Sequence, residues 1–332
     1  MVAGEDAVVN ATTLAHEKFL ETRKQYLGGT DMAGIVGVSQ WASPLSVYLD
    51  KTGTPADGKD SLQMRRGLAL EQFIADEFER VHPELVTWKA KPTVRSDWGF
   101  PAGASTDRLI ATREHPRTPV AILEAKTAFR FGWRDWDEDN ADLPDAYYVQ
   151  VQHYLAVTGL PLAYGAADVG DDKLRIITIP EDLPVQKRLI EAGHEFWTKH
   201  VMAGVPPEPI GTEADRGALL RMYPDTIPEP AIYIEGDEAQ VLLSDYLALK
   251  FKAEEASREA EKAKQGLEAL MGEYEAAIVG HWRLTWKKQT RTTIDSKRLK
   301  AERPEIAAEY SKQSESRSFG APKEFDSEGV MV

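Results

Sequence analysis

The stretch Ala121-Ile122-Leu123-Glu124-Ala125-Lys126-Thr127 is typical of an apolar strand that ends in charged residues, and Ala104-Ser105-Thr106-Asp107 precedes it. Alternate side chains of a strand point to the same face, so Glu124 and Lys126 emerge together. A hard cation such as Mg²⁺ prefers oxygen ligands, and two or three carboxylates with a substrate phosphate suffice. The pattern therefore predicts a metal site at Asp107 and Glu124 beside the Lys126 ammonium, an arrangement suited to phosphodiester cleavage. The alternative is a solvated strand edge with a surface ion pair worth about 0–1 kcal/mol.

A helix is predicted over residues 61–81, with Glu71 beside its apolar face rather than opposite it. A half-buried carboxylate needs a partner, because desolvating an unpaired charge is costly. The partner is either the metal site with Lys126, or an ordinary salt bridge to Arg65 or Arg66. The apolar face consists of Leu70, Phe73, Ile74 and Phe78.

A second helix is predicted over residues 144–158, opened by Pro144 and closed by Gly159. Gln150 and Tyr154 are four residues apart and therefore share a face. A buried glutamine could satisfy its amide with a phosphate oxygen or a metal-bound water, or bond a neighbouring loop carbonyl.

The order of these motifs resembles the YqaJ-type viral recombinases, relatives of the lambda exonuclease within the PD-(D/E)xK nuclease group. The resemblance covers about residues 27–180, and Thr106 stands where many members of the group have proline. It implies a restriction-endonuclease-like core and a metal-dependent alkaline exonuclease that resects double-stranded DNA from 5′ to 3′ for single-strand-annealing recombination. The motifs are Leu27–Gly37, Ser43–Tyr48, Lys51–Gly53, Arg66–Glu71, Asp107, Glu124–Thr127 and Gln150–Leu155.

Residue roles follow from the resemblance, position by position. It implies that Asp107, Glu124 and the Ala125 carbonyl bind Mg²⁺, with Mn²⁺ as the alternative, and that Glu71 is an additional acid and ligand. Lys126 corresponds to the catalytic lysine and Gln150 to the motif glutamine, and Gln152 and Tyr154 would support them. The resemblance also implies double-stranded DNA ends as substrate, a ring-shaped homotrimer around DNA, and a single-strand-annealing partner protein.

The segment Gly28-Gly29-Thr30-Asp31 predicts a tight turn into a helix that starts at Met32, with Thr30 or Asp31 as its cap. Free amide groups at a helix start favour an anion, and Arg23 and Lys24 lie one turn upstream. By resemblance this region is the pocket for a DNA 5′-phosphate, with Thr30, Arg23 and Arg66 as its residues. The alternative is a helix cap without a ligand.

Composition excludes several classes of site. The 332 residues contain no cysteine, so disulfides, thiolate zinc sites and iron–sulfur clusters are excluded. No apolar run approaches a membrane span and no leader opens the chain, so we expect a protein of the bacterial or host-cell cytosol. The net charge is −14, yet residues 281–323 hold eleven Lys or Arg against five acids, a basic tail suited to DNA or to an acidic partner, or simply a solvated surface.

The predicted architecture is an α/β (α+β) domain with a central mixed sheet flanked by helices. We expect an exonuclease domain at 1–205, a proline-rich linker at 206–235, and a helical arm with a basic segment at 236–332. Strands are expected near 86–95, 105–111, 119–127, 162–169 and 173–179, and helices at 13–26, 30–49, 181–203 and 213–222 besides those above.

The arm is predicted to begin with a long helix or coiled coil from Asp237 to Gly280. A hairpin of Trp282–Lys287 with Arg291–Asp295 is expected to follow. Two other functions remain open at this stage: a structure-dependent endonuclease on the same core, and a non-catalytic DNA-binding or scaffolding protein that uses the arm.

Overall fold

The computed structural model describes residues 21–53, 61–127, 143–170, 172–227, 232–312, 317–320 and 322. The chain divides into two compact units, Met1–Asp225 and Thr226–Val332. This division falls inside the segment predicted as a linker. Helix α7 (Glu213–Met222) belongs to the first unit, since Arg221 pairs with Asp50 of helix α3 (Pro44–Thr52) at 2.7 Å and Ala218 is buried.

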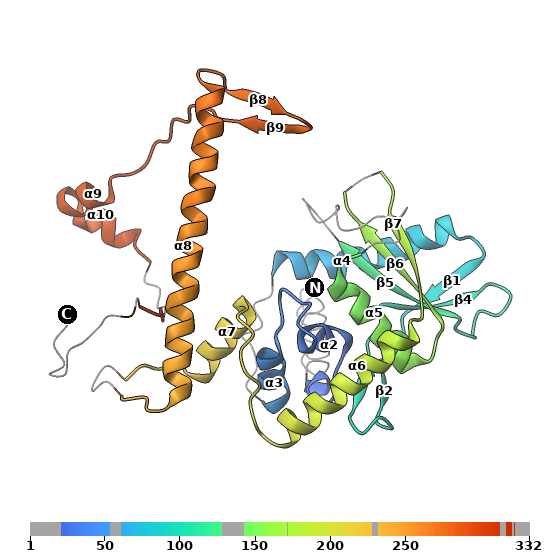
Figure 1. Cartoon of the computed structure of the whole chain (residues 1–332). Coiled ribbons are helices and arrows are strands. Elements are labelled where there is room, and N and C mark those ends of the chain that lie inside the picture. The colour runs from blue at the N-terminus through green and yellow to red at the C-terminus, as the bar shows by residue number, and fades with distance from the viewer. Residues whose placement is uncertain are drawn as a thin grey trace. The chain divides into compact units, whose positions relative to one another are not determined.

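The first unit is built on a five-stranded sheet of order β1-β4-β5-β6-β7 (Figure 1). Strands β5 and β6 are parallel, and helix α5 (Asp145–Thr158) lies between them in the chain. The other neighbouring strands are antiparallel, so the sheet is mixed and the predicted fold class is confirmed. The strands are β1 (Leu85–Trp88), β4 (Arg108–Thr112), β5 (Ala121–Thr127), β6 (Leu162–Asp168) and β7 (Arg175–Pro180).

The two faces of the sheet bury different helices. Helix α4 (Leu62–Val81), capped by the Ser61 side chain, packs on the face that carries Leu123. Helix α5 packs on the opposite face, which carries Ile122. The sequence pattern predicts that Glu124 and Lys126 share a face, and the structure places both on the face that α5 covers.

The predicted single helix at 30–49 is wrong, because two short helices occupy this segment. Helix α2 (Gly29–Ile35) ends before Gly37, whose φ of 77° no helix continues, and α3 begins at Pro44 after the Ser43 cap. The predicted strand at 86–95 is also two elements. Its second part, β2 (Thr93–Arg95), pairs with β3 (Ala102–Ala104) in a separate ribbon.

The first unit closes with helix α6 (Leu183–Phe196), a π-helical turn η2 (Trp197–Met202) and α7. Most of the helix predicted at 13–26 lies outside the described residues. Trp133 and Trp136, whose sequence positions suggest either stacking on a frayed DNA end or anchoring of a loop, also lie outside them. Among the helices that the structure describes, none has an apolar stretch long enough to cross a bilayer.

The second unit contains helix α8 (Asp237–Met271), the hairpin β8 (Ala276–Val279) and β9 (Trp282–Thr285), and the short helices α9 (Ser296–Glu302) and α10 (Pro304–Glu309). The long helix ends at Gly272, not at Gly280, which instead lies in the hairpin turn with φ of 61°. The predicted pairing with residues 291–295 is wrong, because β9 pairs with β8 and Asp295 caps α9.

Candidate active site

Strand β5 brings Asp107 close to Glu124 and Lys126. Asp107, directly before β4, accepts a hydrogen bond on Oδ2 from the Ala125 amide at 2.8 Å. Glu124 is buried, and its Oε1 accepts a hydrogen bond from Lys126 Nζ at 2.6 Å. The antiparallel pairing of β4 with β5 thus places two carboxylates that are 17 positions apart in the sequence next to one ammonium group.

Helix α5 supplies the other side of the site. Gln150 Nε2 donates to Glu124 Oε1 at 2.6 Å and lies 3.2 Å from the Tyr154 hydroxyl. Lys126 Nζ lies 4.9 Å from the centroid of the Tyr147 ring, a favourable cation–π contact. Asp107, Glu124, Lys126 and Gln150 are therefore gathered in one place; their chemical roles remain predictions.

Among the described residues of the site, two carboxylates lie next to one ammonium group. Burial, and next the charge of Glu124, raise the pKa of Asp107 to about 7. Burial alone would lower the pKa of Lys126, but Glu124 and Asp107 outweigh it and the pKa is raised. Glu124 Oε2 is buried and has no hydrogen-bond partner in the described part of the chain. A carboxylate oxygen of this kind favours an additional cation.

Glu71 is placed differently from the other acids. Its carboxylate pairs with Arg108 and, at 3.2 Å, with Lys89, instead of with Arg65, Arg66 or Lys126. It is close enough to raise the pKa of Asp107, as the smallest of the contributions. Within the described residues no group of three or more His, Cys, Asp or Glu is arranged to hold a metal, so a ligand role for Glu71 stays a prediction.

Arg108 is a buried residue that sequence reasoning missed. It follows Asp107 in the chain, so strand alternation turns its side chain away from the Asp107 side and toward α4, where it also bonds Gln72 at 3.0 Å. The predicted apolar face of α4 is partly wrong as well. Phe73 is half exposed, while Ile74, Ala75 and Phe78 are buried.

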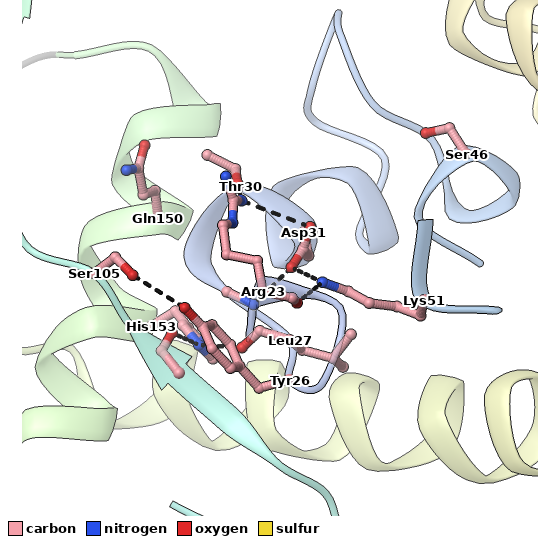
Figure 2. A network of polar contacts seen from close by, with 12 residues as sticks. Arg23, Tyr26, Leu27, Thr30, Asp31, Ser46, Lys51, Ser105, Gln150 and His153 are labelled. Carbon is pink, nitrogen blue, oxygen red and sulfur yellow. Dashed lines mark hydrogen bonds and ion pairs between the residues drawn. The ribbon is translucent and has the colours of Figure 1, made fainter. Parts of the chain in front are cut away.

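A second charged cluster surrounds the start of α2 (Figure 2). Asp31 accepts hydrogen bonds on Oδ2 from Lys51 Nζ and from the Gly28 amide, both at 2.7 Å. Arg23 donates to Thr30 Oγ1 at 2.7 Å and lies 4.0 Å from Asp31. The helix therefore begins at Gly29 with Gly28 as its cap, and Asp31 binds back to Gly28, rather than capping a helix that starts at Met32.

The two clusters meet on α5. A Cβ atom on Gly29 would come within 2.8 Å of Gln150 Cγ, so α2 lies directly against α5 at this point. Burial raises the pKa of Tyr154, Glu124 raises it further, and Arg23 opposes both. Charges from both clusters therefore affect the pKa of Tyr154. Arg66, the third residue predicted for phosphate binding, lies exposed on α4, and its part in the pocket stays a prediction.

Two neighbours of Gln150 on α5, Gln152 and His153, connect this helix to other parts of the first unit. Gln152 bonds the Pro180 carbonyl at 2.8 Å and the Asp182 amide at 2.9 Å, so its hydrogen bonds join α5 to the start of α6 rather than reach the acids. His153 is buried, and its Nε2 lies 3.1 Å from the Leu27 carbonyl and 3.2 Å from the Gly103 carbonyl. Nε2 must carry the proton to bond both oxygens.

Comparison with known families accounts for these features together. Residues 18–161 match the YqaJ-like viral recombinase domain family. The match spans 144 of the 332 residues of this chain. The recognition made from the motifs is thus confirmed, and the YqaJ-like domain contains both charged clusters. The uncharacterized protein YqaJ of Bacillus subtilis (strain 168) is 28% identical over 318 residues, which are 95% of this chain and 97% of that protein.

Solved structures with a related layout include alkaline exonucleases. The structure of LHK-Exo in complex with dAMP has a TM-score of 0.46 at 14% identity, covering 57% of this chain and 94% of that one. The alkaline exonuclease LHK-Exo from Laribacter hongkongensis gives 0.45 at 14% identity, with the same coverage. A phage related exonuclease from Haemophilus somnus 129PT gives 0.41 at 11% identity, covering 54% and 96%. These likenesses are too distant to assign an activity.

Proposed function

We propose that this protein is a divalent-metal-dependent DNA exonuclease that resects linear duplex DNA, from 5′ to 3′, for single-strand-annealing recombination of the phage type. The observation that carries the proposal is the pair of carboxylates beside Lys126, of which Glu124 is buried and has an oxygen without a hydrogen-bond partner in the described residues. Within a viral recombinase domain, such a pair suits hydrolysis of a phosphodiester better than it suits a structural role.

The residues present fit a divalent cation. Asp107, Glu124 and the Ala125 carbonyl would hold it, because all three offer oxygen and Glu124 Oε2 is free of other bonds in the described residues. Mg²⁺ is the proposed ion, with Mn²⁺ as the alternative. A bound ion would supply Lewis-acid stabilisation of the phosphate and a more acidic water.

The side chains around this site have separable tasks. Lys126 keeps its proton, since its pKa is raised, and it offsets the charge that develops on the cleaved phosphate. Gln150 holds Glu124 in place through its amide and also lies within hydrogen-bonding distance of Tyr154. Glu71, fixed by Arg108, adds negative charge near Asp107 without leaving its own ion pair.

The cluster at α2 suits the end of a DNA strand. Arg23 donates to Thr30 Oγ1 at the start of α2, and Lys51 Nζ lies 2.7 Å from Asp31 Oδ2, so two cations stand at this helix start. We propose that Arg23 and Thr30 bind the 5′-phosphate, with Arg66 as a further contact, which would set the polarity of digestion.

The proposed setting follows the resemblance. The protein would act on double-stranded DNA ends in the bacterial or host-cell cytosol, as a ring-shaped homotrimer, with an annealing protein that receives the exposed strand. A gel-filtration mass of one or three chains, in the presence and absence of duplex DNA, tests the oligomer.

The central experiment uses linear duplexes labelled at either end, with and without Mg²⁺, beside nicked and closed circular DNA. We expect metal-dependent nucleotide release from 5′-phosphorylated linear ends and no attack on closed circles. Cleavage of closed circles would instead establish an endonuclease. Parent-like behaviour of Lys126→Ala and Glu124→Ala proteins in every assay would establish a non-catalytic DNA-binding protein.

A further inference from the structure

An aromatic row leads from the site to solvent. The indole of Trp41 stacks on the ring of Tyr147, with ring centroids 6.4 Å apart and planes inclined by 27°. The same Tyr147 ring lies 4.9 Å from Lys126 Nζ. Trp41 lies in the loop between α2 and α3, so this loop is connected to the catalytic strand through Tyr147 of α5.

Trp41 is not packed as a loop anchor. The exposed fraction of Trp41 is 65%. By contrast, Trp98 is partly buried, and Arg95 and Phe100 pack against its ring. The same loop also exposes Val36 and Val38. Binding residues are disproportionately found on loops held by a rigid scaffold, and this loop presents an exposed indole next to Tyr147.

We propose that Trp41 binds an unpaired nucleobase of the DNA strand whose phosphate lies at Lys126. The inference rests on the proposed function, because it places DNA at that lysine. A base has a flat aromatic face, and tryptophan stacks on any of the four bases without reading the sequence. Bases inside a duplex are already stacked on both faces, so Trp41 selects a nucleotide that has left its pair.

Stacking on Trp41 would therefore offset part of the cost of unpairing the strand end. The base would extend the row of Lys126, Tyr147 and Trp41 by one ring, while the phosphate remains near the ammonium group. DNA ends with a mismatched or frayed terminal base pair should therefore bind more tightly than fully paired ends. Separation of the terminal pair should also depend less on Trp41 at such ends.

The test measures base stacking directly. Duplexes carry 2-aminopurine at the first, second, third or eighth nucleotide of the strand end, and the full-length Asp107→Asn protein binds them without consuming the ends. We expect the fluorescence of a base near the end to be quenched in this protein and restored by Trp41→Ala, while Trp41→Phe retains most of the quenching. DNA binding should weaken roughly 5- to 150-fold in the alanine protein, the range of base–aromatic stacking energies.

Control variants separate stacking from folding and from bulk hydrophobicity. Trp41→Leu keeps an apolar side chain without an aromatic face and should behave like the alanine protein. Trp282→Ala removes an equally exposed tryptophan from the second unit and should leave the 2-aminopurine signal unchanged. Quenching that is the same in the parent, Trp41→Ala and Trp41→Leu proteins overturns the proposal.

Steady-state hydrolysis with otherwise unaltered chains distinguishes this proposal from the nuclease proposal. We expect Trp41→Ala to raise KM for DNA ends by a similar factor, with a smaller change in kcat. If the protein hydrolyses DNA and Trp41→Ala matches the parent in both constants, only the stacking proposal fails. If the protein does not hydrolyse DNA at all, the nuclease proposal fails, and the 2-aminopurine result still decides the role of Trp41.

Discussion

Two charge clusters meet at Gln150 of α5, and they differ in how many partners their carboxylates have. At the start of α2, Asp31 is bound by Lys51 and by the Gly28 amide, and Arg23 lies 4.0 Å away. At β5, Asp107 and Glu124 share a single ammonium group, and Glu124 Oε2 is left without a partner in the described residues.

The difference separates a carboxylate with several partners, at Asp31, from two carboxylates that share one ammonium group, at β5. A buried carboxylate with a full set of partners does not lower the stability of the folded state. Two carboxylates close to each other lower that stability unless a further cation binds between them. Under the proposed function, the α2 cluster would bind a strand-end phosphate and the β5 cluster would bind a metal ion.

The largest effect is expected at the paired cluster. Lys51→Ala would leave Asp31, which is mostly buried, without its closest cation, and should lower the free energy of unfolding by about 3–5 kcal/mol. Urea denaturation measures the change. Lys187→Ala, which removes an exposed pair with Glu191, is the matched control and should have no measurable effect. A loss at Lys51 no larger than at Lys187 would show that the α2 cluster does not hold the fold.

The reverse outcome is expected at the unpaired cluster. Asp107→Asn and Glu124→Gln should lower hydrolysis by about 10²- to 10³-fold, because they remove charge that the transition state requires. Stability should stay level or rise, since each change removes a buried negative charge. End-labelled nucleotide release and thermal unfolding are measured together, with Glu195→Gln, an exposed partner of Lys199, as control. A loss of hydrolysis accompanied by an equal loss of thermal stability would contradict the contrast drawn between the two clusters.

The histidine that joins α5 to Leu27 predicts a pH effect on stability. Burial lowers the pKa of His153 from 6.5 to about 4, so the folded state requires neutral imidazole. Stability is then fully present above pH 6.5 and is lost as the pH falls toward 4, by up to about 3 kcal/mol. His153→Gln keeps donors for both carbonyls but does not titrate. Its unfolding free energy should therefore vary less between pH 7 and pH 5, and an equal slope in both proteins would exclude His153 as the cause.

The smallest effect concerns the end phosphate. Arg23→Ala should reduce the preference for 5′-phosphorylated over 5′-hydroxyl ends by about 10- to 100-fold, the value of a charge-assisted hydrogen bond. Competition between the two kinds of end measures the preference. Lys24→Ala removes a neighbouring charge that pairs with Glu21 and is the control. An unchanged preference in the Arg23 protein would leave the α2 cluster as purely structural.

Patterns with a strict local period were readable from the sequence. Strand alternation predicted that Glu124 and Lys126 share a face, and helical spacing predicted that Gln150 and Tyr154 do. Partners that are distant in the chain were not readable. Nothing in the sequence near Asp31 indicates Lys51, and nothing near Tyr147 indicates Trp41, because these contacts depend on how helices pack.

Boundaries failed where local propensity was misleading. Ala276 and Ala277 continue the alanine-rich sequence of α8, so the sequence predicts helix where the structure has strand β8. With β8 hidden in this way, the sequence pattern instead predicts that Arg291–Asp295 pairs with Trp282–Lys287. The φ of 56° at Gly272, which stops the helix, is a property of the folded backbone. The same applies to the break between α2 and α3 at Gly37.

If the protein acts as proposed, the absence of a side chain at Gly29 has a consequence for where it cuts DNA. The α2 backbone lies directly against Gln150 there, so one side chain would separate the proposed strand-end pocket from Glu124. The span between those two places is therefore as stiff as two touching helices. A nuclease built in this way would cut at a constant number of nucleotides from the terminus, with a helix contact as its ruler.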